Sequence, residues 1–155
     1  MNTLRRILLV EDSARDAELV LEAFGTHHLA NEVFHVRDGA EALDYLHRRG
    51  SFADRSNAHP ALVLLDLKMP KVDGLEVLRE MKAAAELKMI PVVIMTSSRE
   101  EQDVVNSYQL GVNAYVVKPV RFHAFIDAVK HLGVFWAMVN EPPPGSLRRT
   151  DDVQT

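Results

Sequence analysis

Five polar residues, each at or beside the end of a short apolar run, are best suited to do chemistry: Glu11, Asp12, Asp66, Thr96 and Lys118. Three carboxylates that lie close together repel one another, and a hard divalent cation such as Mg²⁺, which prefers oxygen ligands, relieves that repulsion. A lysine adds a positive charge that can hold a phosphoryl oxygen, and a threonine hydroxyl can donate a hydrogen bond to another. Carboxylates are also nucleophiles that form aspartyl-phosphates, so Asp66 is a candidate phosphoacceptor.

The apolar runs predict the sheet that must position these residues. Five short, mostly apolar runs lie at residues 7–10, 33–36, 61–65, 91–95 and 114–117. Runs of this kind are typical of strands that are covered on both faces. Residues at helical spacing predict five intervening or following helices, and the polar stretch 49–60 is predicted to be a surface loop. The fold class is therefore α/β, a doubly wound five-stranded parallel sheet in the strand order 2-1-3-4-5.

This strand order brings the polar residues together. In open α/β sheets, ligands bind at the carboxyl ends of the strands, near the point where the strand order reverses. The strands that carry the polar residues are neighbours in the order 2-1-3-4-5, so we expect one common pocket. Taken singly, each residue has an ordinary alternative, because a carboxylate after a strand is usually a helix cap and Lys-Pro is usually a turn. Their coincidence at four strand ends favours a shared site.

With their neighbours, these residues resemble the receiver domains of two-component response regulators. The resemblance covers about residues 6–132 and implies the flavodoxin-like receiver fold. The matching pieces are Leu9-Val10-Glu11-Asp12-Ser13, Leu65-Asp66-Leu67-Lys68-Met69-Pro70 with Gly74, Thr96-Ser97, Tyr115 and Lys118-Pro119.

The resemblance implies a metal site and a modification. Glu11, Asp12 and Asp66 would bind Mg²⁺, for which Mn²⁺ substitutes, and the backbone carbonyl of Lys68 would complete the protein ligands. Asp66 would also accept a phosphoryl group from a partner histidine kinase.

The resemblance further implies a switch. Thr96 and Lys118 would contact the phosphoryl group, and Tyr115 matches the aromatic residue that turns inward when Thr96 moves toward the phosphate. Pro119 matches a position at which the family often has a cis peptide bond.

Two segments depart from the commonest receiver pattern. The stretch 48–59 is longer than usual, and a tail follows Leu132. Both resemble the stand-alone regulators that serve bacterial and cyanobacterial phytochrome kinases, which implies a bacteriophytochrome as the partner kinase. We therefore divide the chain into a receiver domain, 1–132, and a C-terminal extension, 133–155, with an apolar arm, a proline-rich strut and a polar tail.

The apolar arm of the extension contains Phe135, Trp136, Met138 and Val139. Either it folds back on its own core or it pairs with a second molecule, since aromatic and Met residues are enriched in interface cores. We expect the second arrangement, a homodimer held partly by this arm.

Composition excludes several classes of protein. The chain has 155 residues, 47% of them hydrophobic, which suits one globular domain. It has no cysteine, so disulfides and thiolate metal sites are excluded. A net charge of −4 argues against a nucleic-acid partner, and no apolar run reaches the ~20 residues of a membrane span, so we expect a cytoplasmic protein. The seven histidines are interpreted as surface residues.

The function predicted from these observations is a single-domain response regulator that signals through protein–protein contacts. A phospho-relay intermediate or phosphate sink is an alternative that the residues do not separate from it. A Mg²⁺-dependent aspartyl-phosphate phosphohydrolase is a further alternative, but such enzymes usually have a second Asp two residues after the nucleophile, and Lys68 stands there. We expect no enzyme activity beyond self-phosphoryl transfer and autodephosphorylation.

Overall fold

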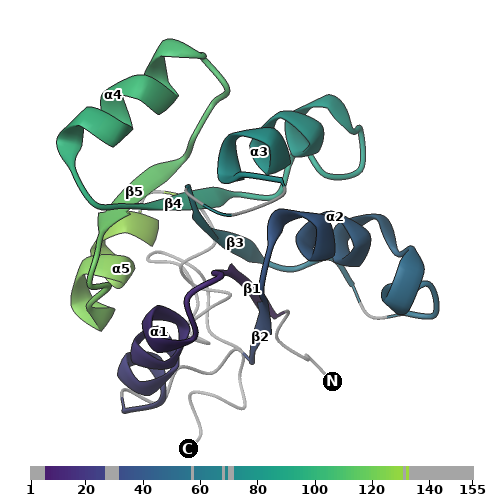
Figure 1. Ribbon diagram of the computed structural model, residues 1–155, viewed down its shortest axis with the longest axis horizontal. Coiled ribbons are helices and arrows are strands. Elements are labelled where there is room, and N and C mark those ends of the chain that lie inside the picture. Colours follow the sequence, from purple (N-terminus) through teal and green to yellow (C-terminus); the bar gives the residue numbers. More distant parts are fainter. Residues whose placement is uncertain are drawn as a thin grey trace, which may run out of the picture.

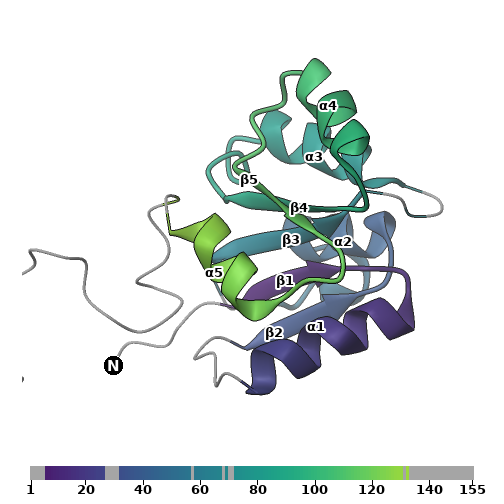
Figure 2. The same ribbon diagram turned by 90° about the vertical axis from the view of Figure 1, so that its left-hand side faces the viewer.

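Five parallel strands form one sheet through the centre of the molecule, in the order β2-β1-β3-β4-β5 (Figures 1 and 2). The computed structural model describes residues 6–26, 32–56, 58–67, 69, 72–130 and 132. The predicted fold class and strand order are both confirmed. The strands are β1 (Ile7–Val10), β2 (Val33–Val36), β3 (Leu62–Asp66), β4 (Val92–Thr96) and β5 (Ala114–Val117).

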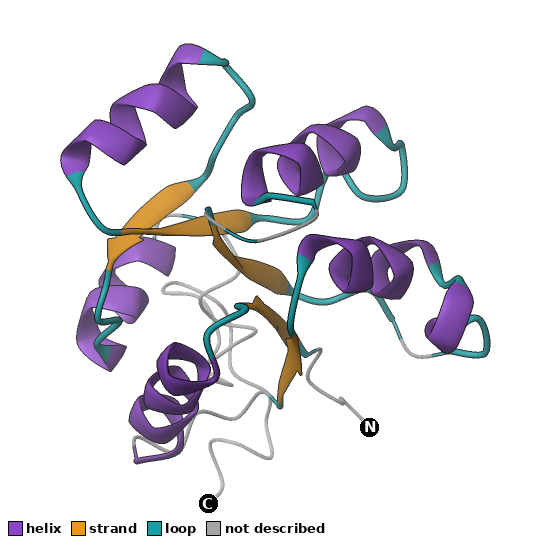
Figure 3. Ribbon diagram, in the orientation of Figure 1, coloured by secondary structure: helices purple, strands orange, loops and turns teal. Residues whose placement is uncertain are grey.

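Helices cover both faces of this sheet (Figure 3). Helices α1 and α5 lie on one face, and α2, α3 and α4 lie on the other (Figure 1). In the described part of the chain the helices are α1 (Ala14–Thr26), α2 (Gly39–His47), the 3₁₀ helix η1 (Gly50–Phe52), α3 (Gly74–Ala83), α4 (Arg99–Ser107) and α5 (Phe122–Val129). Strands and helices therefore alternate, as parallel neighbours require.

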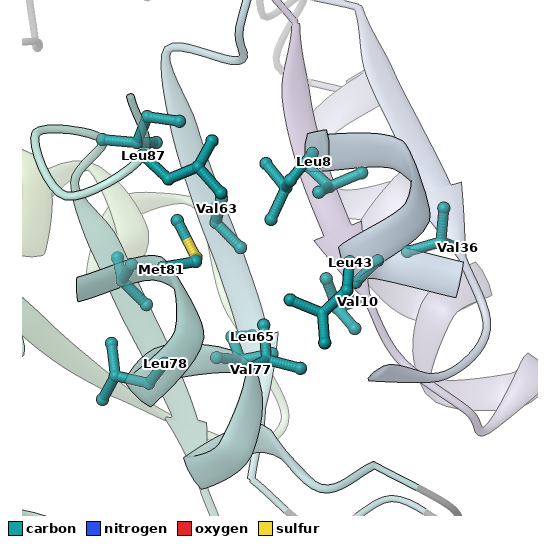
Figure 4. Close-up of a cluster of buried hydrophobic side chains, with 14 of the residues drawn as sticks. Leu8, Val10, Val36, Leu43, Val63, Leu65, Val77, Leu78, Met81 and Leu87 are labelled. Atoms are coloured by element: carbon teal, nitrogen blue, oxygen red, sulfur yellow. The ribbon is translucent and has the colours of Figure 1, made fainter. Parts of the chain in front are cut away.

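Each face of the sheet buries its own apolar cluster. Every residue of β1, β3 and β4 is buried, which explains why their sequences lack the alternation of a half-exposed strand. On the face of α2 and α3, strand and helix side chains such as Leu8 and Met81 point into a common interior (Figure 4). On the other face, the rings of Phe24 and Phe125 pack with centroids 4.6 Å apart. This packing fixes the level at which each strand ends.

Short polar side chains cap the helices on one face. The N-terminal cap residues accept hydrogen bonds from the backbone three residues on: Asp38 from Glu41 at 2.8 Å, Asp73 from Glu76 at 3.0 Å and Ser98 from Glu101 at 3.3 Å. Such caps satisfy backbone N–H groups that the first turn leaves without a partner. The Ser98 cap starts α4 directly after β4, so the first turns of α4 lie beside the end of that strand.

The stretch 49–60 is more ordered than the predicted surface loop. It contains η1, and the Phe52 ring packs edge-on against Tyr45, with centroids 5.1 Å apart. The Arg55 guanidinium lies 4.2 Å from the centroid of the same ring and donates a hydrogen bond to the Tyr45 carbonyl oxygen at 3.0 Å. Most described residues of this stretch lie at the surface, as predicted, but an aromatic residue and an arginine, spaced without a period, pack against α2.

Two helix ends differ from the sequence pattern. The sequence predicts a fourth helix from about Glu100 to Leu110, where Gly111 follows, but α4 ends at Ser107. Gln109 and Gly111 then adopt φ angles of 52° and 72°, in the left-handed region, which redirects the chain toward β5. The sequence pattern also ends the first helix at Gly25, but α1 continues to Thr26.

The predicted extension 133–155 lies outside the described residues, and so do its arm residues Phe135, Trp136, Met138 and Val139. The division into two segments stays a prediction. Across the part of the chain that the structure describes, none of the helices has the length and apolar character needed to cross a membrane.

Candidate functional site

Three carboxylates meet at the carboxyl ends of β1 and β3. Oxygen atoms of Glu11, Asp12 and Asp66 all lie within 4.8 Å of one another. The parallel register pairs Val10 with Leu65, so Glu11 and Asp66 follow at the same level on adjacent strands. Glu11 and Asp66 are 1% and 5% exposed, whereas Asp12 is exposed. The fold thus brings the three predicted carboxylates together and removes two of them from water.

Lys118 adds a positive charge from the end of β5. Its Nζ lies 3.0 Å from Glu11 Oε1 and 3.1 Å from Asp66 Oδ1. Its backbone N–H donates a hydrogen bond to the Thr96 carbonyl oxygen at 2.8 Å, which ties Lys118 to the end of β4. The Lys118-Pro119 peptide bond is cis, as the resemblance implies. One ammonium therefore faces two buried carboxylates, and negative charge remains in excess.

This arrangement changes how both kinds of group bind protons. Burial raises the pKa of Asp66, the charge of Glu11 raises it further, and Lys118 lowers it, so that the pKa is about 7. For Lys118, burial lowers the pKa, but the hydrogen bonds and charges of Glu11 and Asp66 raise it more, so it lies above the ordinary value. Lys118 therefore stays an ammonium, and near pH 7 Asp66 is only partly ionised unless further positive charge is supplied.

The donor set fits Mg²⁺ or Mn²⁺, which take oxygen ligands. The buried Glu11 Oε1 faces Lys118 Nζ at 3.0 Å and shares that ammonium with Asp66. Two buried carboxylates that share one positive charge are costly, and a bound cation would supply the missing charge. Lys68, whose backbone carbonyl is a predicted ligand, lies outside the described residues, so that role stays a prediction.

Gly74 keeps the loop after Asp66 close to α3. A Cβ atom at position 74 would lie 2.4 Å from the Asp66 carbonyl oxygen and 2.9 Å from Leu67 Cα. The Gly74 N–H instead donates a hydrogen bond to the Leu67 carbonyl oxygen at 3.0 Å. Only glycine permits this approach, so the glycine of the matching motif has a direct steric purpose beside the candidate phosphoacceptor.

Thr96 and Tyr115 both contact α4. Thr96 is fully buried at the end of β4, and its Oγ1 accepts a hydrogen bond from Gln102 Nε2 at 3.3 Å. The half-buried Tyr115 donates its hydroxyl hydrogen to Asn106 Oδ1 and lies 3.5 Å from the Gln102 carbonyl oxygen. Burial and the charge of Asp103 raise the pKa of Tyr115, so it remains a donor. Gln102, which the sequence pattern did not single out, joins the two predicted switch residues.

Asp16 is a second residue that sequence reasoning missed. It lies in the first turn of α1, and its Oδ2 accepts a hydrogen bond from Lys118 Nζ at 3.3 Å. Its place four residues after Asp12 puts it one helical turn from the acidic pair. The sequence shows this spacing, but it does not indicate that Asp16 would contact a lysine 102 residues away.

His35 corrects the interpretation of all seven histidines as surface residues. It is half-buried on β2, and its Nε2 lies 2.7 Å from the Glu11 carbonyl oxygen. A short apolar run with a histidine in third place gave no indication of this contact, because the pairing of β1 with β2 creates it.

Comparison with known proteins agrees with this geometry. The family model described as "Response regulator receiver domain" matches residues 7–130. The response regulator Rcp1 of Synechocystis sp. is 42% identical over 130 residues, which cover 84% of this chain and 87% of Rcp1.

Three solved structures are similar to this one. The bacteriophytochrome response regulator AtBRR is 61% identical, with a TM-score of 0.85 over 90% of this chain and 100% of AtBRR. The Mn²⁺-bound form of Rcp1 is 39% identical, with a TM-score of 0.68 over 94% and 99% of the two chains. The phosphorylated cyanobacterial phytochrome response regulator RcpA is 42% identical, with a TM-score of 0.69 over 86% and 94%. From its fold, its acidic cluster and these matches, the chain belongs to the response regulator receiver family.

Proposed function

We propose that this chain is a single-domain response regulator whose Asp66 accepts a phosphoryl group from a histidine kinase in a Mg²⁺-dependent step. One observation carries the proposal. Asp66 is a buried carboxylate at the end of β3, within a cluster of oxygen ligands, and Lys118 Nζ lies 3.1 Å from its Oδ1. Structural ion pairs seldom bury two carboxylates around one ammonium, whereas phosphoryl transfer requires that charge and position.

The chemistry divides among the residues of the cluster. An oxygen of ionised Asp66 attacks phosphorus, and the bond from phosphorus to the kinase histidine nitrogen breaks. That nitrogen keeps the bonding electron pair, and because the other ring nitrogen carries a proton, neutral imidazole leaves. Lys118 holds one phosphoryl oxygen, and the Thr96 hydroxyl donates a hydrogen bond to another once it leaves Gln102. Mg²⁺ held by Glu11, Asp12 and Asp66, when bound, neutralises charge on the transferring group. Because the pKa of Asp66 is about 7 without a cation, such a cation also favours its ionised form.

The relatives support a partner and a mode of action. AtBRR and RcpA are described as phytochrome response regulators, and Rcp1 has been solved with Mn²⁺. We therefore propose a bacteriophytochrome histidine kinase as the partner, in the cytoplasm, with output through protein–protein contacts and no nucleic-acid target. The homodimer is proposed from the sequence of the arm around Trp136 alone.

Receiver-domain response regulators are signalling proteins. We propose no catalytic activity for this chain beyond self-phosphoryl transfer and autodephosphorylation. Lys68 stands where aspartyl-phosphate phosphohydrolases usually have their acid/base Asp, which argues against that reaction.

The test is phosphoryl transfer itself. The full chain is incubated with a phosphorylated bacteriophytochrome kinase and Mg²⁺, and the intact protein mass is measured. The parent should gain one phosphoryl group, and Asp66→Asn and samples with a chelator should gain none. Asp127→Asn is the matched control, because it removes a carboxylate that is 70% exposed on α5 and pairs there with Lys130. Equal labelling of Asp66→Asn and the parent would overturn the assignment of Asp66.

A further inference from the structure

Lys118 has a third carboxylate partner, which the proposed reaction does not use. Its Nζ lies 3.3 Å from Asp16 Oδ2, in addition to the contacts with Glu11 and Asp66. The backbone N–H of Asp16 donates a hydrogen bond to Ser13 Oγ at 3.2 Å, so the start of α1 fixes its position. An ammonium has three N–H donors, and here three carboxylates surround it.

The three partners differ in burial. The side chains of Glu11 and Asp66 are 1% and 7% exposed, whereas that of Asp16 is 41% exposed and makes the longest of the three contacts. Glu11 and Asp66 would therefore hold Lys118 in the cluster even if Asp16 were absent. The contact with Asp16 is not needed to anchor the lysine, and its effect must come from where it draws the ammonium.

We infer that Asp16 is a positioning residue that draws Lys118 toward α1. It thereby strengthens the binding of a divalent cation at the cluster and weakens the binding of a phosphoryl group there. This inference rests on the function proposed above. When Lys118 pairs with Asp16, its positive charge competes less with a divalent cation for Glu11 and Asp66. A phosphoryl group on Asp66 needs the same ammonium, and it must take Lys118 from Asp16 while lying near one more negative charge.

Removal of the Asp16 charge should therefore move two affinities in opposite directions. Mg²⁺ should bind more weakly, because Lys118 turns fully to Glu11 and Asp66. The phosphoryl group should be held more tightly, because Lys118 has one competitor fewer. A partly exposed ion pair changes an equilibrium by roughly two- to fivefold. Damage to the fold would weaken both kinds of binding, so the opposite signs distinguish positioning from a structural role.

The experiment uses the full chain and two probes. Mg²⁺ alone is titrated by calorimetry, and beryllofluoride, a phosphoryl mimic, is titrated by ¹⁹F NMR at saturating Mg²⁺ for each variant. We expect Asp16→Asn to raise the Mg²⁺ dissociation constant and to lower the half-saturating beryllofluoride concentration, each by about two- to fivefold. Asp16→Glu, which keeps the charge, should lie closer to the parent in both. Glu22→Gln is the matched control, because it removes one charge from the exposed part of α1.

Each result decides one question. If Asp16→Asn leaves both affinities unchanged, or moves both the same way, the inference is wrong while the proposed function stands. If Glu22→Gln reproduces the effect, the cause is net charge and the positioning role is also wrong. If the parent binds neither Mg²⁺ nor beryllofluoride at millimolar concentrations, the proposed function itself fails.

Discussion

The two ends of the central sheet hold their charged side chains in opposite ways. At the carboxyl ends of β1 and β3, Glu11 and Asp66 are buried beside each other with one shared ammonium, and the pKa of Asp66 rises to about 7. At the amino end of β1, Arg6 Nη1 donates a hydrogen bond to the Tyr45 hydroxyl at 3.3 Å, and Arg55 lies 4.2 Å from the centroid of the same ring.

The difference shows where this fold is stabilised and where it is prepared for a ligand. A guanidinium over an aromatic face, with carbonyl acceptors for its N–H groups, contributes to stability, although burial and the like charges of Arg48 and Arg6 lower the pKa of Arg55. Two buried carboxylates cost stability until a cation or a proton arrives. The amino end therefore offsets part of the cost of the carboxyl end, and substitutions at the two ends should have distinct signatures.

Tyr45→Ala should have the largest effect and should leave the site intact. Tyr45 is 1% exposed, and its ring contacts Phe34, Phe52 and Arg55. We expect a loss of about 3–5 kcal/mol in the free energy of unfolding, measured by urea denaturation. Tyr45→Phe, the matched control, loses the hydroxyl and its hydrogen bond with Arg6, and should cost about 1 kcal/mol. If Tyr45→Ala still folds and its Mg²⁺ affinity falls in parallel with stability, the two ends are not independent.

Asp66→Asn should stabilise the protein at pH 8 when Mg²⁺ is absent. The pKa of Asp66 rises from its ordinary 3.8 to about 7 in the folded chain. A raised pKa gives a contribution to stability that is complete below the unfolded value and is lost as the pH rises through the folded value. The parent thus loses stability between about pH 4 and 7 through this group, and asparagine, which stays neutral, does not.

The expected gain at pH 8 is about 4 kcal/mol, with no difference at or below about pH 4. Chemical denaturation at the two pH values measures it. Mg²⁺ binds the folded parent and should therefore reduce the difference in stability between Asp66→Asn and the parent. If Asp66→Asn is less stable than the parent at pH 8 without Mg²⁺, ionised Asp66 does not destabilise the folded protein as proposed.

Arg55→Met should have a moderate effect, limited to the amino end. Methionine keeps the apolar stem but loses the cation over Tyr45 and the hydrogen bonds to the carbonyl oxygens of Tyr45 and Ala58. We expect a loss of about 1–2 kcal/mol. Arg49→Met is the control, because that exposed arginine pairs with Asp44 at the surface and should contribute at most about 0.5 kcal/mol. Equal losses of stability in Arg55→Met and Arg49→Met would show that Arg55 contributes no more than a surface arginine.

Gln102→Leu should have the smallest effect and should touch the carboxyl end alone. It removes the donor to Thr96 Oγ1 and leaves the Gln102 backbone contact with Tyr115 in place. With its hydroxyl released, Thr96 should turn more readily to a phosphoryl oxygen, and beryllofluoride should bind about twofold more tightly. Weaker beryllofluoride binding in a variant of unchanged stability would mean that Gln102 assists Thr96 instead of restraining it.

Much of the carboxyl end could be predicted from the sequence. The apolar runs determine the strand ends, and the strand order then determines which polar residues meet, so Glu11, Asp12, Asp66 and Lys118 were expected together. The strand order and the register of the parallel strands are sufficient to predict that these side chains lie together. The resemblance to receivers added the switch that couples Thr96 to Tyr115, which spacing alone does not provide.

The remaining contacts depend on side-chain geometry that no period encodes. Phe52 and Arg55 lie in a stretch without repeat, and only the fold shows that they meet Tyr45. Gln102 and Asp16 each reach across to another element, where their partner is decided by the angle at which a helix packs. Polar residues at strand ends can be predicted from a sequence, whereas side-chain contacts of helices and loops with other elements cannot.

The bond between Lys118 and Asp16 also has a consequence for the order in which the chain is made. It joins residues 102 positions apart, so a chain synthesised from its N-terminus contains Glu11, Asp12, Asp16 and Asp66 before Lys118 exists. Because domains generally fold as units, the carboxylates and the ammonium come together only after β5 has been made. The environment that lets Asp66 react as proposed therefore depends on one of the last elements of the fold to be synthesised.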